Sequence, residues 1–179
     1  MTAKEEKAII LDFLPYGYPL EKKMMPIAQA MGAKTFVLLE LVPRKGVKLE
    51  SKEEVYIGEG KREQIYYILG RLKADKLTEN AKRVLEELIT SRVLEDESRF
   101  IEFFNTASAI NTRLHQFELL PGFGKKHTLA ILDKRKEKPF ESFKDLKKRV
   151  SNLPDPIHTI AKRIVSELKG NERYLIFTQ

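Results

Sequence analysis

The chain has 179 residues and contains neither cysteine nor tryptophan. Without cysteine it can form no disulfide bond and no thiolate metal site. It also lacks a run of about 18 apolar residues, which a membrane-spanning helix requires. The charged N-terminal segment, residues 1–7, has no apolar core of the signal-peptide kind. Together these absences predict a cytoplasmic protein that has no membrane partner.

The sequence also lacks the common motifs of catalysis and metal binding. Its histidines, His115, His127 and His158, stand singly, and no His-Glu-x-x-His pair is present. There is no Gly-x-Ser-x-Gly nucleophile motif, and the aspartates are scattered, whereas a two-metal nuclease needs an acidic cluster. We therefore expect no catalytic residue, no metal, no cofactor and no enzyme activity.

The positive charge of the chain is unevenly distributed. An apolar content of 42% is enough for a packed core, and the length allows one or two small domains. Residues 1–110 hold 18 Lys and Arg against 18 Asp and Glu, whereas residues 111–179 hold 15 against 8, so the C-terminal part carries the whole net charge of +7. Such asymmetry favours a polyanionic partner. The alternative is a solvated basic surface that serves solubility.

The most informative segment is 119–126, LLPGFGKK, which lies inside this basic part. A Pro-Gly-Phe-Gly turn joins two short helical patterns, and two lysines follow it. The amides in the first turn of a helix have no intrahelical acceptor, and the helix dipole favours an anion there. Glycines let a ligand approach the backbone closely. The segment therefore predicts a phosphate site at Gly122, Gly124, Lys125 and Lys126.

The first third of the chain has the pattern of short β-strands. Apolar runs bounded by proline or glycine occupy residues 8–14, 25–31, 35–42 and 54–57. Four or five short strands within so few residues fit a small β-barrel of the OB type. We therefore predict an N-terminal OB-like barrel domain over residues 1–75.

Helical spacing follows the predicted barrel. Apolar positions at Ile65, Ile68, Leu69 and Leu72 indicate a helix over residues 61–72. Thr78 is suited to cap an amphipathic helix, and another helix begins near Asp96. These patterns predict a helical connector over residues 76–110.

The basic segment, residues 111–170, has the pattern of several short helices. Ile110, Leu114 and Phe117 are spaced to share one helical face that leads into the Pro-Gly turn. Ser142 followed by Asp145 is a capping-box signature for a helix that starts at residue 143.

A second turn, residues 153–156, precedes a last helix that Gly170 can end. Residues 171–179 then contain a strand candidate that can return to the barrel. The expected fold class is therefore α+β with two domains, a small barrel followed by helices and a C-terminal all-α domain.

Residues 111–170 resemble a tandem helix-hairpin-helix domain, on the match of Gly122, Phe123, Gly124 and Lys125 to its phosphate-binding hairpin. The resemblance implies that the two glycines offer backbone N–H groups to a phosphate and that Phe123 packs inward. The second hairpin departs from the pattern because Asp155 and Pro156 stand in place of the glycines. We expect this second hairpin to have a structural role, since proline has no N–H and aspartate repels phosphate.

Nearly the whole chain resembles an archaeal family of predicted RNA-binding proteins, catalogued as domain of unknown function 655. The resemblance is carried by residues 9–15, 39–43 and 55–62. It implies a barrel and a helical domain that bind nucleic acid for an unknown purpose, and it brings no catalytic residues.

Two further sites are candidates for binding. Gly58, Gly60, Lys61 and Arg62 precede the helix expected at 61–72 and can form a second phosphate site, although a simple strand-to-helix turn explains them too. Tyr16 and Tyr18 lie in a loop flanked by prolines. Exposed tyrosines on a barrel can stack on bases, but tyrosines in such loops also pack against the turn.

Basic residues near the hairpin add diffuse phosphate contacts in this interpretation. Lys134 and Arg135 follow the turn along one helix, and Lys147 and Lys148 lie on the next. Such contacts raise affinity and its salt dependence without selecting a sequence. The alternative is a solvated charged face.

The sequence thus predicts a protein that binds nucleic acid with little sequence preference. RNA is favoured over DNA because the family and the OB-like barrel favour it, although the hairpin is commoner among DNA-binding proteins. The alternative is a protein-interaction module of a translation- or repair-linked complex, which the irregular second hairpin favours. A processing nuclease is a third hypothesis. The sequence does not identify a protein partner.

Overall fold

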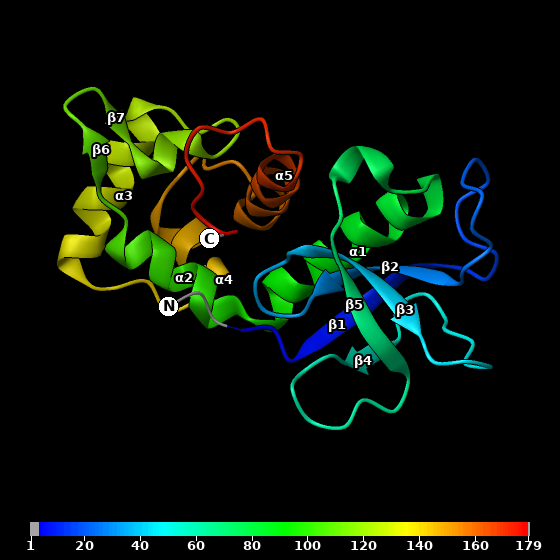
Figure 1. Ribbon diagram of the computed structural model, residues 1–179. Helices are drawn as coiled ribbons and strands as arrows, with labels where there is room; N and C mark the ends of the chain where they lie inside the picture. The colour runs from blue at the N-terminus through cyan, green and yellow to red at the C-terminus, as the bar shows by residue number, and fades with distance from the viewer. Residues whose placement is uncertain (1–3, 179) are drawn as a thin grey trace. The chain divides into compact units, whose positions relative to one another are not determined.

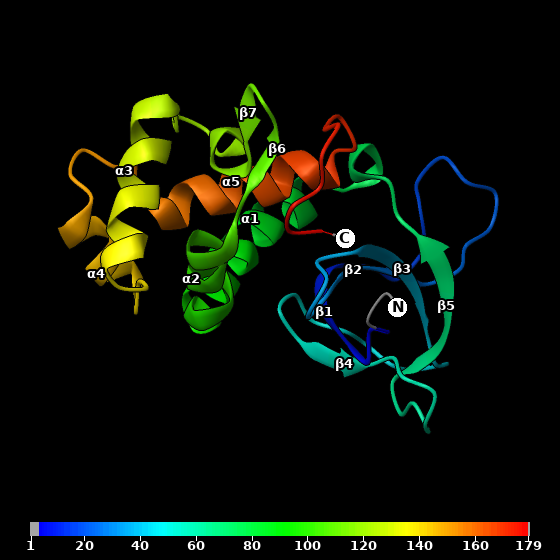
Figure 2. The same ribbon diagram turned by 90° about the vertical axis from the view of Figure 1, so that its left-hand side faces the viewer.

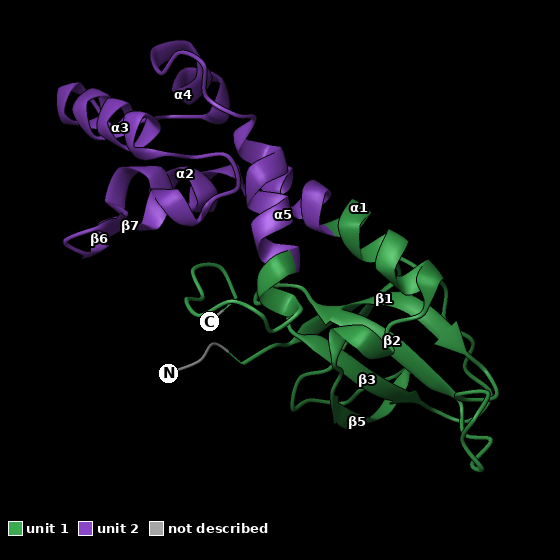
Figure 3. Ribbon diagram, turned by 90° about the horizontal axis from the view of Figure 1, so that it is seen from above, with its two compact units in different colours: residues 1–88, 166–179 green, residues 89–165 purple. Residues whose placement is uncertain are grey.

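The computed structural model describes residues 4–178 and has a mixed α+β fold. Two compact units divide the chain (Figure 3). The sheet unit comprises the residues up to Leu88 together with the segment from Ser166 onward, and the helical unit comprises Ile89–Val165. The division passes through two helices, α1 (Glu79–Glu95) and α5 (Pro156–Leu168).

The sheet unit is built on one antiparallel sheet of five strands, β1 (Lys7–Leu14), β2 (Ile27–Gly32), β3 (Leu38–Pro43), β4 (Glu54–Tyr56) and β5 (Ile65–Arg71). The strand order is β4-β1-β2-β3-β5, so β4 and β5 are the two edges. The sheet curls into a half-barrel (Figure 2). The four strands predicted at 8–14, 25–31, 35–42 and 54–57 are confirmed.

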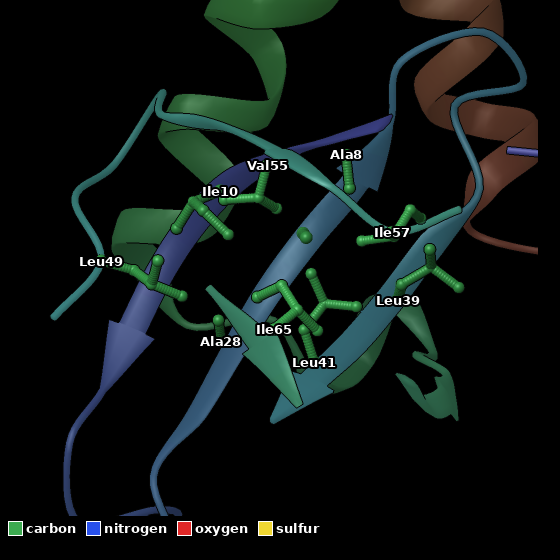
Figure 4. Packing of buried hydrophobic residues seen from close by; sticks show 10 residues of the cluster. Ala8, Ile10, Ala28, Leu39, Leu41, Leu49, Val55, Ile57 and Ile65 are labelled. Carbon is green, nitrogen blue, oxygen red and sulfur yellow. The ribbon is translucent and has the colours of Figure 1, made fainter. Parts of the chain in front are cut away.

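Alternate residues of the strands fill the concave side of this half-barrel (Figure 4). Every residue of β2 and β3 is buried, so both faces of these strands are covered, and their residues are apolar except for Gln29 and Glu40. The cluster on the concave side consists of Ala8, Ile10, Ala28, Ala30, Leu39, Leu41, Leu49, Val55, Ile57 and Ile65.

The helix predicted over 61–72 is wrong, because this segment forms β5. The β3–β5 ladder shifts register twice, between Val42 and Pro43 and between Glu40 and Leu41. Each bulge inserts an extra residue into β5, so the inward positions Ile65 and Ile68 stand three residues apart. That spacing imitates the period of a helix in a segment that is extended.

The connector helices lie where the sequence placed them. After a short 3-10 turn, η1 (Ala74–Lys76), Thr78 caps α1 by accepting the Ala81 amide at its Oγ1, 3.0 Å away. The same hydroxyl donates to Asp12 Oδ2 at 2.6 Å, which ties the start of α1 to strand β1. Helix α2 (Glu97–Thr106) follows Asp96 as predicted.

The helical unit contains a small hairpin that the sequence did not predict. Strands β6 (Ala109–Asn111) and β7 (Leu114–His115) lead into η2 (Gln116–Leu119), so the helical face predicted for Ile110, Leu114 and Phe117 is wrong. The Oδ1 atom of Asn111 accepts the Arg113 amide at 2.8 Å, and this local turn competes successfully with helix formation.

The remaining helices of this unit are α3 (Lys125–Glu137) and α4 (Phe143–Arg149). Ser142 caps α4 as predicted, because its Oγ accepts the Asp145 amide at 3.0 Å. The Asp145 carboxylate accepts the amide of Glu141, one residue before the cap.

The C-terminal segment forms no strand within residues 171–178, and the strand predicted there is wrong for the described residues. The buried carboxylate of Glu167 accepts the amides of Ile176, Phe177 and Thr178 at 2.9–3.1 Å. Because one carboxylate satisfies these donors, the segment needs no neighbouring strand. Gly170 follows α5 with φ of 79°, the left-handed conformation of a helix end.

Candidate nucleic-acid interface

The first hairpin, residues 120–124, has the conformation that its glycines allow (the chain here runs from η2 to α3 in Figure 1). Gly122 has φ of 82°, and the Phe123 amide donates to the Leu120 carbonyl at 3.1 Å to close the turn. The Phe123 side chain is 6% exposed and its ring centre lies 6.3 Å from that of Phe104. Phe123 therefore packs inward, while Gly122 and Gly124 stay at the surface.

Three amides of this hairpin point to no acceptor within the described chain. They belong to Gly122 and to the first helical residues, Lys125 and Lys126. The Gly124 amide is different, because it donates to His127 Nδ1 at 3.1 Å. The N–H groups available to a phosphate are therefore those of Gly122, Lys125 and Lys126, whereas the sequence predicted those of Gly122 and Gly124.

His127 joins the first hairpin to the second, residues 150–156. The hydrogen bond from the Gly124 amide makes Nδ1 the acceptor and assigns the ring hydrogen to Nε2. Nε2 then donates to the Asn152 carbonyl at 3.1 Å. Pro154 also lies beside the first hairpin, since a Cβ on Gly122 would be 3.4 Å from Pro154 Cγ. The two hairpins are thus adjacent.

The second hairpin repeats the backbone of the first with other residues. Asn152 has φ of 58° and corresponds to Gly122, and the buried Val150 corresponds to Leu120. The sequence pattern aligns Asp155 with a glycine of the first hairpin, and the structure gives a different correspondence. Asp155 stands directly before α5, and its carbonyl accepts the Thr159 amide. Pro154 and Pro156 have no N–H, so this hairpin offers few donors.

The two lysines after the first hairpin differ in their partners. Lys125 Nζ donates to the Arg113 carbonyl at 2.9 Å and lies 3.3 Å from Glu118 Oε1. The pKa of Glu118 is lowered, first by the hydrogen bond from the His115 amide and then by Lys125. Lys126 is exposed and has no ion-pair partner within residues 4–178. Lys126 is therefore the freer cation.

Arg135 and Arg149 bind carbonyl groups inside the helical unit. Arg135 donates to the carbonyls of Phe104 and Ala107 at the end of α2, and burial lowers its pKa. Arg149 donates to the carbonyls of Lys134 and Lys138 at 2.6 and 2.7 Å. These guanidinium groups satisfy the last carbonyls of helices, so the half-buried Arg135 is less available to a phosphate than the exposed lysines.

The other predicted lysines lie at the surface. Lys134 pairs with Glu137 at 3.1 Å, and Lys147 lies 3.8 Å from Asp155. Lys148 is exposed and has no ion-pair partner within the described chain.

The second predicted phosphate site, Gly58 to Arg62, lacks the helix on which that prediction depended. The segment leads into β5, so no helix dipole points at it. Its polar groups are used internally, since the Gly60 amide donates to Tyr56 Oη at 3.0 Å and Arg62 Nε donates to the Gly58 carbonyl at 2.7 Å. A Cβ on Gly58 would collide with the Tyr56 ring. Lys61 is exposed beside this loop.

The two loop tyrosines have different environments. Tyr16 is 72% exposed. Tyr18 donates through Oη to Glu40 Oε2 at 2.9 Å and accepts from Gln29 Nε2 at 3.1 Å. Burial, together with Glu40, raises the pKa of Tyr18 to about 12. Tyr18 thus belongs to a buried polar network, and only Tyr16 remains free to stack.

Acid should destabilise the helical unit through His115. Its Nδ1 accepts the Phe117 amide at 3.1 Å, and burial, followed by the charge of Arg135, lowers its pKa. Because the unfolded chain binds this proton more readily, the stabilisation is complete above the unfolded pKa of about 6.5 and declines as pH falls below it. We expect the melting temperature to drop between about pH 7 and about pH 5. The substitution His115→Asn, whose Oδ1 can accept the same amide, should reduce that drop, and an equal drop in both proteins would contradict this role.

Within residues 4–178, no three His, Asp or Glu side chains are placed to hold a metal ion together. No helix in that range is long and apolar enough to cross a membrane.

Comparison with known proteins finds uncharacterised archaeal relatives. The family model described as "Protein of unknown function (DUF655)" matches residues 4–179. An uncharacterised protein of Methanocaldococcus jannaschii is 42% identical over 177 residues, which cover 98% of this chain and 80% of that protein. A crystal structure of a DUF655 protein from Archaeoglobus fulgidus matches with a TM-score of 0.88 at 42% identity, over 98% of this chain and 100% of that one.

Proposed function

The chain belongs to the DUF655 family, and we propose that it binds the phosphate backbone of nucleic acid, without catalysis and with little sequence preference. The observation that carries this proposal is the group of three unpaired amides, those of Gly122, Lys125 and Lys126, at one tight turn. Amides at a helix start, next to a glycine in the left-handed region, form a concave donor group for an anion. Lys126 supplies charge at the same place.

The paired hairpins support the view that residues 111–170 form a tandem helix-hairpin-helix domain. Gly122 and Asn152 share the left-handed conformation, and His127 connects the two turns. The 15 basic against 8 acidic residues in the C-terminal part supply the long-range attraction that a polyanion needs.

The structure of the sheet unit is the reason why we favour RNA over DNA as the nucleic acid that is bound. A five-stranded curled sheet is the scaffold of OB-like domains, which bind single strands on their open surface. In this proposal the half-barrel is OB-like, although it pairs β3 with β5 in antiparallel fashion and has no helix between β3 and β4 within the described residues.

A protein-interaction module is the second candidate. The second hairpin favours it, because Pro154 and Pro156 remove two donors and Asp155 adds a negative charge. In this case the first hairpin would have the same structure without binding free nucleic acid.

Fluorescence anisotropy with duplex RNA of two unrelated sequences, repeated at several salt concentrations, tests the proposal. We expect equal affinity for both sequences. The logarithm of the association constant should fall linearly with the logarithm of the salt concentration, with a slope of about −0.7 to −0.9 for each phosphate contacted. Absence of binding at low salt would overturn the proposal and favour the interaction module.

A further inference from the structure

Exposed apolar side chains concentrate on one part of the sheet unit. Six of the ten large hydrophobic side chains exposed in the described chain come from two segments, the loop between β1 and β2 and strand β5. Leu20 is 99% exposed and Tyr66 is 64% exposed. Apolar groups gathered at a surface mark a binding site more often than they serve the fold. The six residues are Tyr16, Leu20, Met24, Tyr66, Tyr67 and Leu69.

The two segments meet beside a pocket. Tyr67 Oη donates to Met25 Sδ at 3.7 Å, and the rings of Tyr66 and Tyr67 contact each other edge to face with centres 5.3 Å apart. A cavity of about 210 Å³ lies next to this contact. Its lining residues include Tyr18, Glu21, Lys23, Met25, Glu40, Leu69 and Lys76, and Lys76 Nζ lies 3.4 Å from Glu21 Oε1.

The pocket combines a polar wall with apolar groups. Glu40 and Tyr18 contribute the polar wall. Met25 and Leu69 line the pocket with apolar groups that can contact the faces of a planar ring.

The Glu40 carboxylate presents an unused acceptor to the pocket. Glu40 is 8% exposed, and its Oε2 accepts from Tyr18 Oη at 2.9 Å. Its Oε1 lies 3.8 Å from Lys76 Nζ, which is an ion pair longer than a hydrogen bond. Within the described chain no donor reaches Oε1. The described chain leaves no buried side-chain oxygen atom without a hydrogen-bond partner, so Oε1 is accessible from the pocket. An accessible carboxylate oxygen without a donor suits a ligand that brings an N–H group.

We propose that this pocket binds one unpaired base of single-stranded RNA, whose exocyclic amino group donates to Glu40 Oε1. Neighbouring bases stack on Tyr66 and Tyr16. Lys22 and Lys23 in the loop and Lys76 at the pocket neutralise the adjoining phosphates. The inference rests on the proposed function and names its substrate class, single strands in which the recognised base carries an exocyclic amino group, as cytosine, adenine and guanine do and uracil does not.

The size and the surroundings of the pocket favour this occupant. Its volume is smaller than the 300–1,000 Å³ or so of pockets for drug-sized ligands, so it suits a single ring system. Tyrosines together with lysines are the usual combination for unpaired bases, because aromatic faces stack on them and ammonium groups pair with phosphates.

Two RNA oligomers of roughly ten nucleotides, one of cytidines and one of uridines, provide the test by fluorescence anisotropy at constant salt. We expect the cytidine oligomer to bind about fivefold more tightly, because uracil has no exocyclic amino group. Glu40→Gln should weaken the cytidine oligomer to the level of the uridine oligomer and leave the latter unchanged. Tyr66→Ser should weaken both oligomers about tenfold. Leu94→Ser, which changes an exposed leucine of α1, is the matched control and should change neither.

Equal binding of the two oligomers, unaffected by Glu40→Gln and Tyr66→Ser, would overturn the inference. If duplex binding through the first hairpin persisted in those variants, the proposed function would stand and the tyrosine surface would belong to a protein partner. If no nucleic acid bound at low salt, the inference and the proposed function would both fail. If Glu40→Gln lowers the melting temperature, its loss of affinity is no longer informative, and the Tyr66→Ser variant tests the inference instead. The Tyr66 side chain is largely exposed, so its replacement should not affect folding.

Discussion

Replacing Gly122 with valine is expected to weaken the binding of every duplex by about tenfold or more. Gly122 has φ of 82°, a region that a β-branched residue enters only at a cost of about 1–3 kcal/mol. A Cβ at this position also lies 3.4 Å from Pro154 Cγ, so further atoms of valine press on the second hairpin. The turn then moves, and the amides of Gly122, Lys125 and Lys126 no longer converge on one phosphate. Anisotropy titration against two unrelated duplexes measures the effect.

Gly46 provides the matched control for this strain. It has φ of 79° in the loop between β3 and β4, and no atom lies within 4 Å of a Cβ built there. Gly46→Val therefore imposes a similar backbone cost in the sheet unit without touching the hairpins. We expect it to lower the melting temperature and to leave duplex affinity unchanged. Equal loss of affinity in both variants would show that Gly122→Val acts through general destabilisation, and unchanged affinity in Gly122→Val would refute the hairpin as the phosphate site.

Lys126→Glu should produce the second large effect, about a tenfold loss of duplex affinity at roughly 0.1 M salt. Lys126 is exposed in the first turn of α3, next to the amides that carry the proposed phosphate site. Glutamate would place a negative charge beside the phosphate and remove one released counterion. The salt slope should therefore become less steep by about one contact. The effect should be the same for unrelated sequences, since phosphates carry no sequence information.

Lys45→Glu changes the net charge by the same amount and controls for long-range attraction. Lys45 is exposed in the loop between β3 and β4, in the sheet unit. We expect only a small loss of affinity and an unchanged salt slope. If the two charge reversals were equally harmful, Lys126 would contribute only to the general field of the protein and not to a phosphate site.

The fold of the sheet unit could be predicted wherever the strands are regular. Strands β1 to β4 coincide with apolar runs that end at proline, glycine or charge, and these signals are local. Strand β5 could not be predicted, because one of its two bulges lies between the inward residues Ile65 and Ile68 and gives them the spacing of a helix. That spacing assigns Tyr66 and Tyr67 to a helix, so the sequence does not reveal them as exposed side chains of a strand.

In the helical unit, too, the local conformation of the first hairpin, residues 120–124, could be predicted, but its long-range contacts could not. The Pro-Gly-Phe-Gly sequence predicts a sharp turn with unusual φ values at its glycines, and the resemblance to a helix-hairpin-helix domain implies the inward Phe123. Neither gives any indication that His127 Nδ1 accepts a hydrogen bond from the Gly124 amide, or that His127 Nε2 is hydrogen-bonded to the carbonyl of Asn152, which is distant in the sequence. The burial of the Arg135 guanidinium against the end of α2 is also a long-range contact, so charge patterning alone counted it as a surface cation.

The most direct measurement is an amide chemical-shift titration of the full chain with a short duplex RNA. If the first hairpin binds phosphate, the largest shifts should fall on the amides of Gly122, Lys125 and Lys126, and these shifts should disappear in Gly122→Val. The Gly124 amide, which already donates to His127, should shift less. Shifts confined to other residues, with these three amides unmoved at saturation, would contradict the account.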